Sequence, residues 1–293
     1  MKRLRKTTET QVKIYGPKYT GFMRKAELVS LVYFAALTLL ALLRTLPPPS
    51  RLKAVGLGAA GLMLVLSGWM TPQFLPAAVS ATIRDWLPGI FILLAYWQSG
   101  CFFHNPNPSL QRKFEKWDRK LLSALRFKIW ANSPVAAFLE LAYMLCYPVV
   151  PLGVAALYAE GLQHQVDDYW LIVLLSAYPC YALLPFVQLL PPRSIESPDA
   201  FLQYRGALRR FNLWIVRHAT HQATTFPSGH VAASAAIAFA LLRFAAPMGL
   251  VFLFIAIGIA LGCVVGRYHY AIDVVAALLL AGAMFFIAVG VVQ

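Results

Sequence analysis

Long apolar runs separated by short polar segments dominate this chain. Eight such runs cover about residues 28–46, 54–70, 86–103, 134–158, 170–190, 230–246, 248–266 and 271–292. Each is close to the roughly 20 residues that a helix needs to cross ~30 Å of hydrocarbon. The pattern therefore predicts an all-α fold, a polytopic transmembrane helical bundle of about eight spans.

The segments between the runs are of two kinds. Residues 71–85 are interrupted by Pro72 and Pro76, so we expect a loop or a re-entrant piece there. Residues 110–130 and 201–217 place apolar side chains at helical spacing, with Lys and Arg mostly on the other faces. Basic amphipathic helices lie in the headgroup layer, so we expect these two segments to bind anionic lipid headgroups.

Composition supports the membrane interpretation. Apolar residues make up 59% of the chain and charged residues only 13%, whereas a soluble domain has roughly 25% charged residues. The net charge of +14 comes from Lys and Arg that lie between the apolar runs, where they meet lipid headgroups. The chain carries no motif of a groove-reading helix, so nucleic acid is not an expected partner.

The charge distribution gives conflicting signals for orientation. Residues 1–27 form a basic tail with eight Lys and Arg residues, which favours a cytoplasmic N-terminus. With eight spans, the two basic amphipathic segments lie on the opposite face. Because the first span usually dominates, we expect a multi-pass protein of the cell membrane with a cytoplasmic N-terminus.

Three short stretches place polar side chains beside the ends of apolar runs. They are Pro191-Pro192-Arg193, Phe226-Pro227-Ser228-Gly229-His230, and the segment from Gly266 to Asp273. In an eight-span topology all three emerge on one face, the extracytoplasmic one in the orientation expected above. The pattern therefore predicts that they converge on one site.

The residue types in these stretches suit phosphate chemistry. Ser228 and Gly229 lead into a predicted helix, whose N-terminus offers free N–H groups to an anion. His230 in the first turn could protonate a leaving alkoxide. Arg193 and Arg267 supply guanidinium forks that match phosphate oxygens.

A second histidine has a carboxylate one helical turn away. His269 and Asp273 are four residues apart, so they share one face of a helix. A carboxylate on one imidazole nitrogen fixes the tautomer and raises the basicity of the other nitrogen. This arrangement predicts a nucleophilic histidine.

Phe226-Pro227-Ser228-Gly229-His230, followed by His269 and Asp273, resembles the second and third motifs of the type-2 phosphatidic acid phosphatase superfamily. Pro191-Pro192-Arg193 resembles the first motif. The family's six-span core would correspond to about residues 86–293, and residues 28–85 would be extra N-terminal membrane segments. Residues 117–119 and 138–143 resemble the branch of the inositol phosphorylceramide synthases.

The resemblance implies a metal-independent phosphoric monoester hydrolase or phosphotransferase on lipids, with no cofactor. His269 would attack phosphorus and form a phosphohistidine, Asp273 would orient His269, and His230 would protonate the leaving group. The remaining four residues, Arg193, Ser228, Gly229 and Arg267, would hold the phosphate. Two family positions differ here: a motif lysine is Phe186, and a motif arginine is Cys263, one helical turn before Arg267.

Several alternatives remain at this level. The chain could be a lipid phosphate phosphatase, a phosphotransferase with an alcohol acceptor, or a transporter or scaffold without turnover. Glu140 could be functional or a buried brace. His218 and His221 offer only two ligands, and no cysteine pair has metal-ligand spacing, so we expect no metal site. The sequence carries no signal of oligomeric state.

Overall fold

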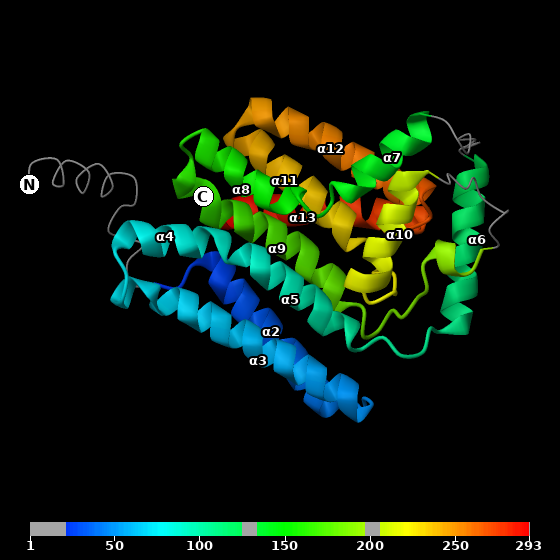
Figure 1. Ribbon diagram of the computed structural model, residues 1–293, viewed down its shortest axis with the longest axis horizontal. Coiled ribbons are helices and arrows are strands. Elements are labelled where there is room, and N and C mark those ends of the chain that lie inside the picture. Colours follow the sequence, from blue (N-terminus) through cyan, green and yellow to red (C-terminus); the bar gives the residue numbers. More distant parts are fainter. Residues whose placement is uncertain (1–21, 125–133, 197–205, 293) are drawn as a thin grey trace, which may run out of the picture.

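The chain is a helical bundle (Figure 1). The computed structural model describes residues 22–124, 134–196 and 206–292; these contain helices, short turns and one isolated bridge between Leu189 and Thr224. The first helices are α2 (Lys25–Leu43), α3 (Pro48–Met70), α4 (Ala77–Trp86), α5 (Pro88–Gly100), α6 (Pro108–Ala124) and α7 (Pro134–Met144). They are followed by α8 (Val149–Ala159), α9 (Val166–Ala182), α10 (Ala207–Ala219), α11 (Gly229–Phe244), α12 (Ala246–Val265) and α13 (Ala271–Val292).

The predicted all-α membrane architecture is confirmed. In the described part of the chain, five helical stretches are long and apolar enough to cross a membrane: α2, α3, α4 with α5, α12 and α13. The α7–α8 pair makes a sixth if it is one bent span. Helices α9 and α11 coincide with two further predicted runs but have only 17 and 16 residues. The count of eight spans stays a prediction.

The expectation of a loop or re-entrant piece at residues 71–85 holds for residues 71–76 but was wrong for residues 77–85. A short 3-10 turn from Thr71 to Gln73 leads into α4, which is nearly continuous with α5. Pro72 lies in the first turn of its helix and Pro76 caps α4, and helix starts tolerate proline because their N–H groups lack intrahelical partners. The predicted core boundary at residue 86 therefore falls inside one span.

The predicted run at 134–158 forms two helices instead of one. Helices α7 and α8 meet at an angle of 73°. Pro148 lies at the junction and caps α8. Proline removes a backbone donor and clashes with the preceding turn, which accounts for the bend.

Helix α11 forms the centre of the bundle. It packs against α9, α12, α13 and α8, and most of its residues are buried. Its sequence is rich in alanine, whose small side chain lets neighbouring helices approach closely. Helix α11 is therefore a rigid support for the residues at its N-terminus.

The N-terminal hairpin of α2 and α3 lies at the edge of the bundle and packs on α9 and α5 (Figure 1). Ion pairs fasten the start of α2 to the last turn of α4 and the first turn of α9. They are Arg24–Asp85 at 2.6 Å, Arg84–Glu27 at 2.7 Å and Lys25–Asp168 at 2.6 Å. Because the first four of these side chains are buried, the hairpin is firmly attached to the rest of the bundle.

Helices α6 and α10 lie at one end of the bundle in Figure 1, close to the start of α11. Both are amphipathic, as predicted for headgroup-layer helices. The basic tail up to residue 21 lies outside the described residues, as do the end of the first amphipathic segment and the start of the second.

Candidate active site

The three motif stretches lie side by side. The backbone N–H of Arg193 donates to the carbonyl of Arg267 at 3.1 Å, which joins the first stretch to the third. The N–H of Ser228 donates to the carbonyl of Asp273 at 3.1 Å, which joins the second to the third. Backbone contacts between residues up to 74 positions apart thus build one polar site at the start of α11 and α13.

The two histidines of these stretches are in direct contact. His230 Nδ1 lies 3.4 Å from His269 Nε2, and the ring centroids are 5.6 Å apart. His230 is held by the first turn of α11, and His269 precedes α13. A gap of 3.4 Å leaves no room for a tetrahedral anion between the nitrogens, so flanking a phosphorus atom would require these rings to move apart.

His269 and Asp273 are joined through a residue that the sequence analysis did not single out. Thr224 Oγ1 lies 2.8 Å from His269 Nδ1 and donates to Asp273 Oδ2 at 3.2 Å. The direct contact between Nδ1 and Oδ2 is 3.3 Å. Because Asp273 Oδ2 also accepts the backbone N–H of Tyr270, it is an acceptor. The Thr224 hydroxyl therefore donates to Asp273, and the Nδ1–H of His269 donates to Thr224.

This arrangement fixes the tautomer of His269. A proton on Nδ1 leaves the lone pair on Nε2, the nitrogen that faces His230. Asp273 Oδ2 also accepts the N–H of Tyr270 at 3.1 Å, which holds the carboxylate in place. Burial and, as the next cause, the charge of the nearby Arg193 lower the pKa of His269 to about 3, so its resting form is neutral.

The two arginines predicted to bind phosphate differ in their surroundings. Arg193 Nη1 donates to the Tyr268 carbonyl at 3.3 Å, and the guanidinium lies 5.4 Å from the Tyr268 ring centroid. Among the described residues Arg193 has no carboxylate partner. Burial lowers the pKa of Arg193 from its ordinary value. Arg193 is therefore available for an anion.

Arg267 is held by two carboxylates. Its Nη2 donates to Asp118 at 2.7 Å and its Nε to Glu196 at 2.8 Å. Asp118 also accepts the N–H of Ala271 at the start of α13, at 2.7 Å. Although burial lowers the pKa of Arg267, the bonds to Glu196 and Asp118 raise it above its ordinary value. In this arrangement Arg267 ties α6 to the third stretch.

Ser228 and Gly229 shape the start of α11. The Ser228 hydroxyl caps the helix by accepting the Val231 N–H at 3.5 Å. The Gly229 N–H donates to Thr225 Oγ1 at 3.1 Å, and a Cβ at Gly229 would lie 2.5 Å from the Tyr181 ring. Ser228 and Gly229 thus hold the start of the helix and, with it, His230. This role is additional to the predicted phosphate contact.

A network on α7 and α10 supports the site from one side. Glu140 accepts hydrogen bonds from Arg209, Asn212 and the Tyr268 hydroxyl, at 2.7–2.8 Å. The Tyr268 ring stacks on Tyr143 at 3.6 Å. Glu140 is therefore a hydrogen-bonded brace, and Arg209, which the sequence suggested as a lipid contact, is an inward-facing cation.

A largely apolar cavity of about 420 Å³ reaches the site from within the bundle. It lies among α5, α8 and α11, and His230 and Tyr147 form part of its wall together with residues such as Ile90, Leu93 and Val150. The described residues contain no group of three or more His, Cys, Asp or Glu side chains placed to hold a metal ion.

Comparison with known proteins supports part of the expected relationship. Residues 168–293, from the start of α9 to the C-terminus, match the family model of the PAP2 superfamily. This region contains all three motif stretches. No curated protein and no solved structure matches the chain. The match supports the superfamily, whose members are generally membrane phosphatases or phosphotransferases.

Proposed function

We propose that this protein is an integral-membrane lipid phosphate phosphatase that acts through a phosphohistidine. The observation that carries the proposal is the chain of contacts from Asp273 through Thr224 to His269, which turns the free lone pair of His269 toward His230. The family match over residues 168–293 supports a phosphatase or phosphotransferase activity.

The proposed reaction assigns a role to each of these groups. Nε2 of His269 attacks phosphorus while the bond to the lipid oxygen breaks, and His230 gives that oxygen a proton. Arg193 offsets the charge on the equatorial oxygens. Water, deprotonated by His230, then attacks the phosphohistidine, which releases phosphate and restores His269. Binding must separate the two rings and bring a proton to His230.

A lipid substrate fits the surroundings of His230. The apolar cavity beside this residue runs into the membrane-spanning helices and is large enough for part of an acyl chain. The basic side chains of α6 and α10 would draw anionic headgroups to the same end of the bundle. We propose the extracytoplasmic face for this end, with the N-terminus in the cytoplasm, and cysteine labelling in intact cells tests that orientation.

A phosphotransferase is the alternative that a specific observation favours. Asp118 and Glu140 lie in the two segments that resemble the inositol phosphorylceramide synthase branch, and both contact the third motif stretch. The chemistry is shared up to the phosphohistidine, after which an alcohol would replace water. Assays with and without inositol or a ceramide, reading phosphate release and new lipid products, separate the two.

The test uses protein purified in detergent and a panel of lipid phosphates. Phosphate release should be inhibited by vanadate, which mimics five-coordinate phosphorus, and should survive a chelator. Loss of activity in EDTA would overturn the metal-independent assignment. His269→Ala should abolish the phosphoenzyme, whereas His230→Ala should still trap it from a substrate with a good leaving group. A transporter or scaffold would function unchanged in both variants.

A further inference from the structure

The cavity of about 420 Å³ beside His230, called the α5–α8 cavity below, follows one face of a helix. Trp86, Ile90, Leu93 and Trp97 line it at spacings of four, three and four residues, so they form a stripe along the end of α4 and α5. These four residues are 38–47% exposed. A cavity wall that is itself exposed leaves the cavity open along the helix, toward the hydrocarbon chains of the bilayer.

The opening lies between α5 and α8. Helix α5 packs mainly against α3, α9 and α2, and α8 packs mainly against α11. Within the described chain these two helices have little contact with each other. Val150 and Pro151, which follow the 73° bend between α7 and α8, line the opposite wall. A lipid chain can therefore enter sideways from the bilayer, without passing through the headgroup end of the bundle.

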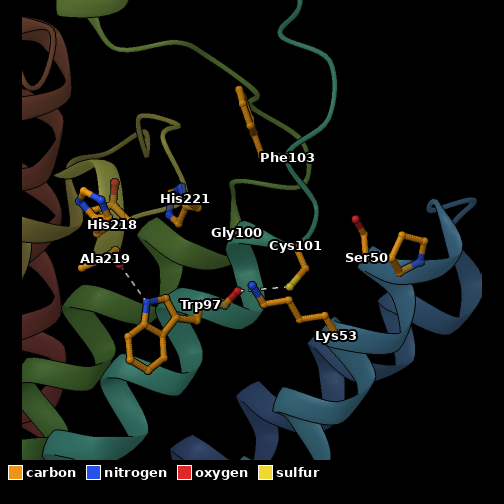
Figure 2. A pocket seen from close by; sticks show the side chains of 11 residues that line it. Ser50, Lys53, Trp97, Gly100, Cys101, Phe103, His218, Ala219 and His221 are labelled. Atoms are coloured by element: carbon orange, nitrogen blue, oxygen red, sulfur yellow. Dashed lines mark hydrogen bonds between the residues drawn. The ribbon is translucent and has the colours of Figure 1, made fainter. Parts of the chain in front are cut away.

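A hydrogen bond bounds the end of the cavity nearest the two motif histidines. Trp97 Nε1 donates to the Ala219 carbonyl at 3.1 Å, which joins α5 to the end of α10 (Figure 2). Both residues line the cavity, as do Gly229 and His230 at the start of α11. A chain that lies in the cavity therefore places its polar end beside His230.

The depth of the cavity matches one leaflet of a bilayer. Trp97 at the active-site end and Trp86 at the other end belong to one nearly continuous helical stretch. Eleven residues separate them, which is about 16 Å at ~1.5 Å per residue. Half of a hydrocarbon core of ~30 Å is about 15 Å. One extended lipid chain with its phosphate at His230 would therefore reach the level of Trp86.

Gly89 leaves space at the inner end of the cavity. It lines the cavity three residues after Trp86, and a Cβ at this position would meet only the Trp170 ring, at 3.8 Å. This is ordinary van der Waals contact, so the helix has room for a side chain at Gly89. Because Gly89 borders the cavity, a large side chain there would occupy the space in which the end of a long lipid chain would lie.

We propose that the α5–α8 cavity binds one hydrocarbon tail of the lipid substrate, that the tail enters between α5 and α8, and that Gly89 sets the longest tail accepted. The inference rests on the proposed function for the phosphate end of the same molecule. It goes beyond that function because it makes the protein select among lipids by tail length and assigns the selection to a named residue.

Binding is tested without turnover, by photolabelling of the purified protein. The probe is a non-hydrolysable dodecyl phosphonate with a diazirine at the end of its chain, competed with unlabelled dodecyl phosphonate. The competed label should lie on residues 86–93 and 150–151. Dodecanol with the same diazirine lacks the anionic group that Arg193 would hold, and should need about tenfold more probe for the same label. Equal labelling by the alcohol, or label that is not competed, overturns the inference.

Two substitutions narrow the cavity from opposite walls. Gly89→Leu should reduce the competed label about tenfold, the discrimination that an apolar pocket achieves against a chain that is too long. Val150→Phe should do the same from α8, and decides the test if Gly89→Leu does not fold. Gly56→Leu and Leu152→Phe are the matched controls, because these exposed residues of α3 and α8 lie outside the cavity lining. Both controls should label like the wild type.

Turnover measures selection by tail length. The ratio of kcat/KM for hexadecyl phosphate to kcat/KM for octyl phosphate should fall about tenfold in Gly89→Leu and in Val150→Phe. A wild-type pattern of label in both variants, or an unchanged ratio in both, overturns the inference. Absence of turnover on every lipid phosphate, with the competed label in place, overturns the proposed function alone.

Discussion

Thr224→Val is the sharpest test of how the site activates His269. Valine has nearly the shape of threonine but lacks the hydroxyl. The substitution removes the 2.8 Å contact to His269 and the 3.2 Å bond to Asp273, and leaves the direct 3.3 Å contact between these two residues. Asp273 keeps the N–H of Tyr270.

The magnitude follows from what is left behind. Thr224 is 1% exposed, so water cannot replace the lost hydroxyl. A buried polar group left without a partner costs about 1–3 kcal/mol of stability. Loss of a group that orients a functional imidazole lowers activity by about 10–100-fold. We expect kcat for phosphate release to fall by this factor while KM changes little.

The assay measures phosphate release from a lipid phosphate in detergent micelles, with the melting temperature recorded in the same detergent. Thr224→Ser should restore most of the activity because it restores the hydroxyl. Ser176→Ala, which removes a buried hydroxyl bonded only within α9, is the control and should keep full activity. A Thr224→Val enzyme with wild-type kcat would refute the relay.

Three further predictions concern stability and pH. Arg267→Met should destabilise the protein by about 3–5 kcal/mol, because it leaves the buried Asp118 without its cation. Arg193 has no carboxylate partner, so Arg193→Met should instead abolish phosphate release and leave the melting temperature nearly unchanged. Gly229→Ala should cost about 1–3 kcal/mol by overpacking the Tyr181 ring, whereas Gly282→Ala, whose new Cβ meets nothing within 4 Å, should not destabilise. The pKa of His269 is lowered to about 3 in the folded protein. The unfolded chain therefore binds more protons than the folded one between pH 3 and about 6.5. The free energy of unfolding should fall on acidification through that window, and less steeply in His269→Asn.

The sequence determined the class of fold. Runs of about twenty apolar residues can satisfy their backbone groups in a membrane only as helices, so the positions of most apolar helices could be predicted from hydrophobicity, whereas α4 and the division between α7 and α8 could not. The three motif stretches were also visible, because their residues are adjacent in the chain or one helical turn apart. Local pattern could not supply the length of each helix. In sequence, a proline that begins a helix looks the same as a proline at a bend between two helices, such as Pro148.

Only the tertiary structure decided the partners of these residues. Thr224 lies 45 positions from His269, and Arg267 meets Asp118 across 149 positions; no spacing rule links residues so distant. From sequence alone, a motif arginine is interpreted as a phosphate ligand. Only the structure shows whether a buried carboxylate already pairs with it. Helix packing determines which charges are already paired, and thereby which of them, here Arg193, remains available to a ligand.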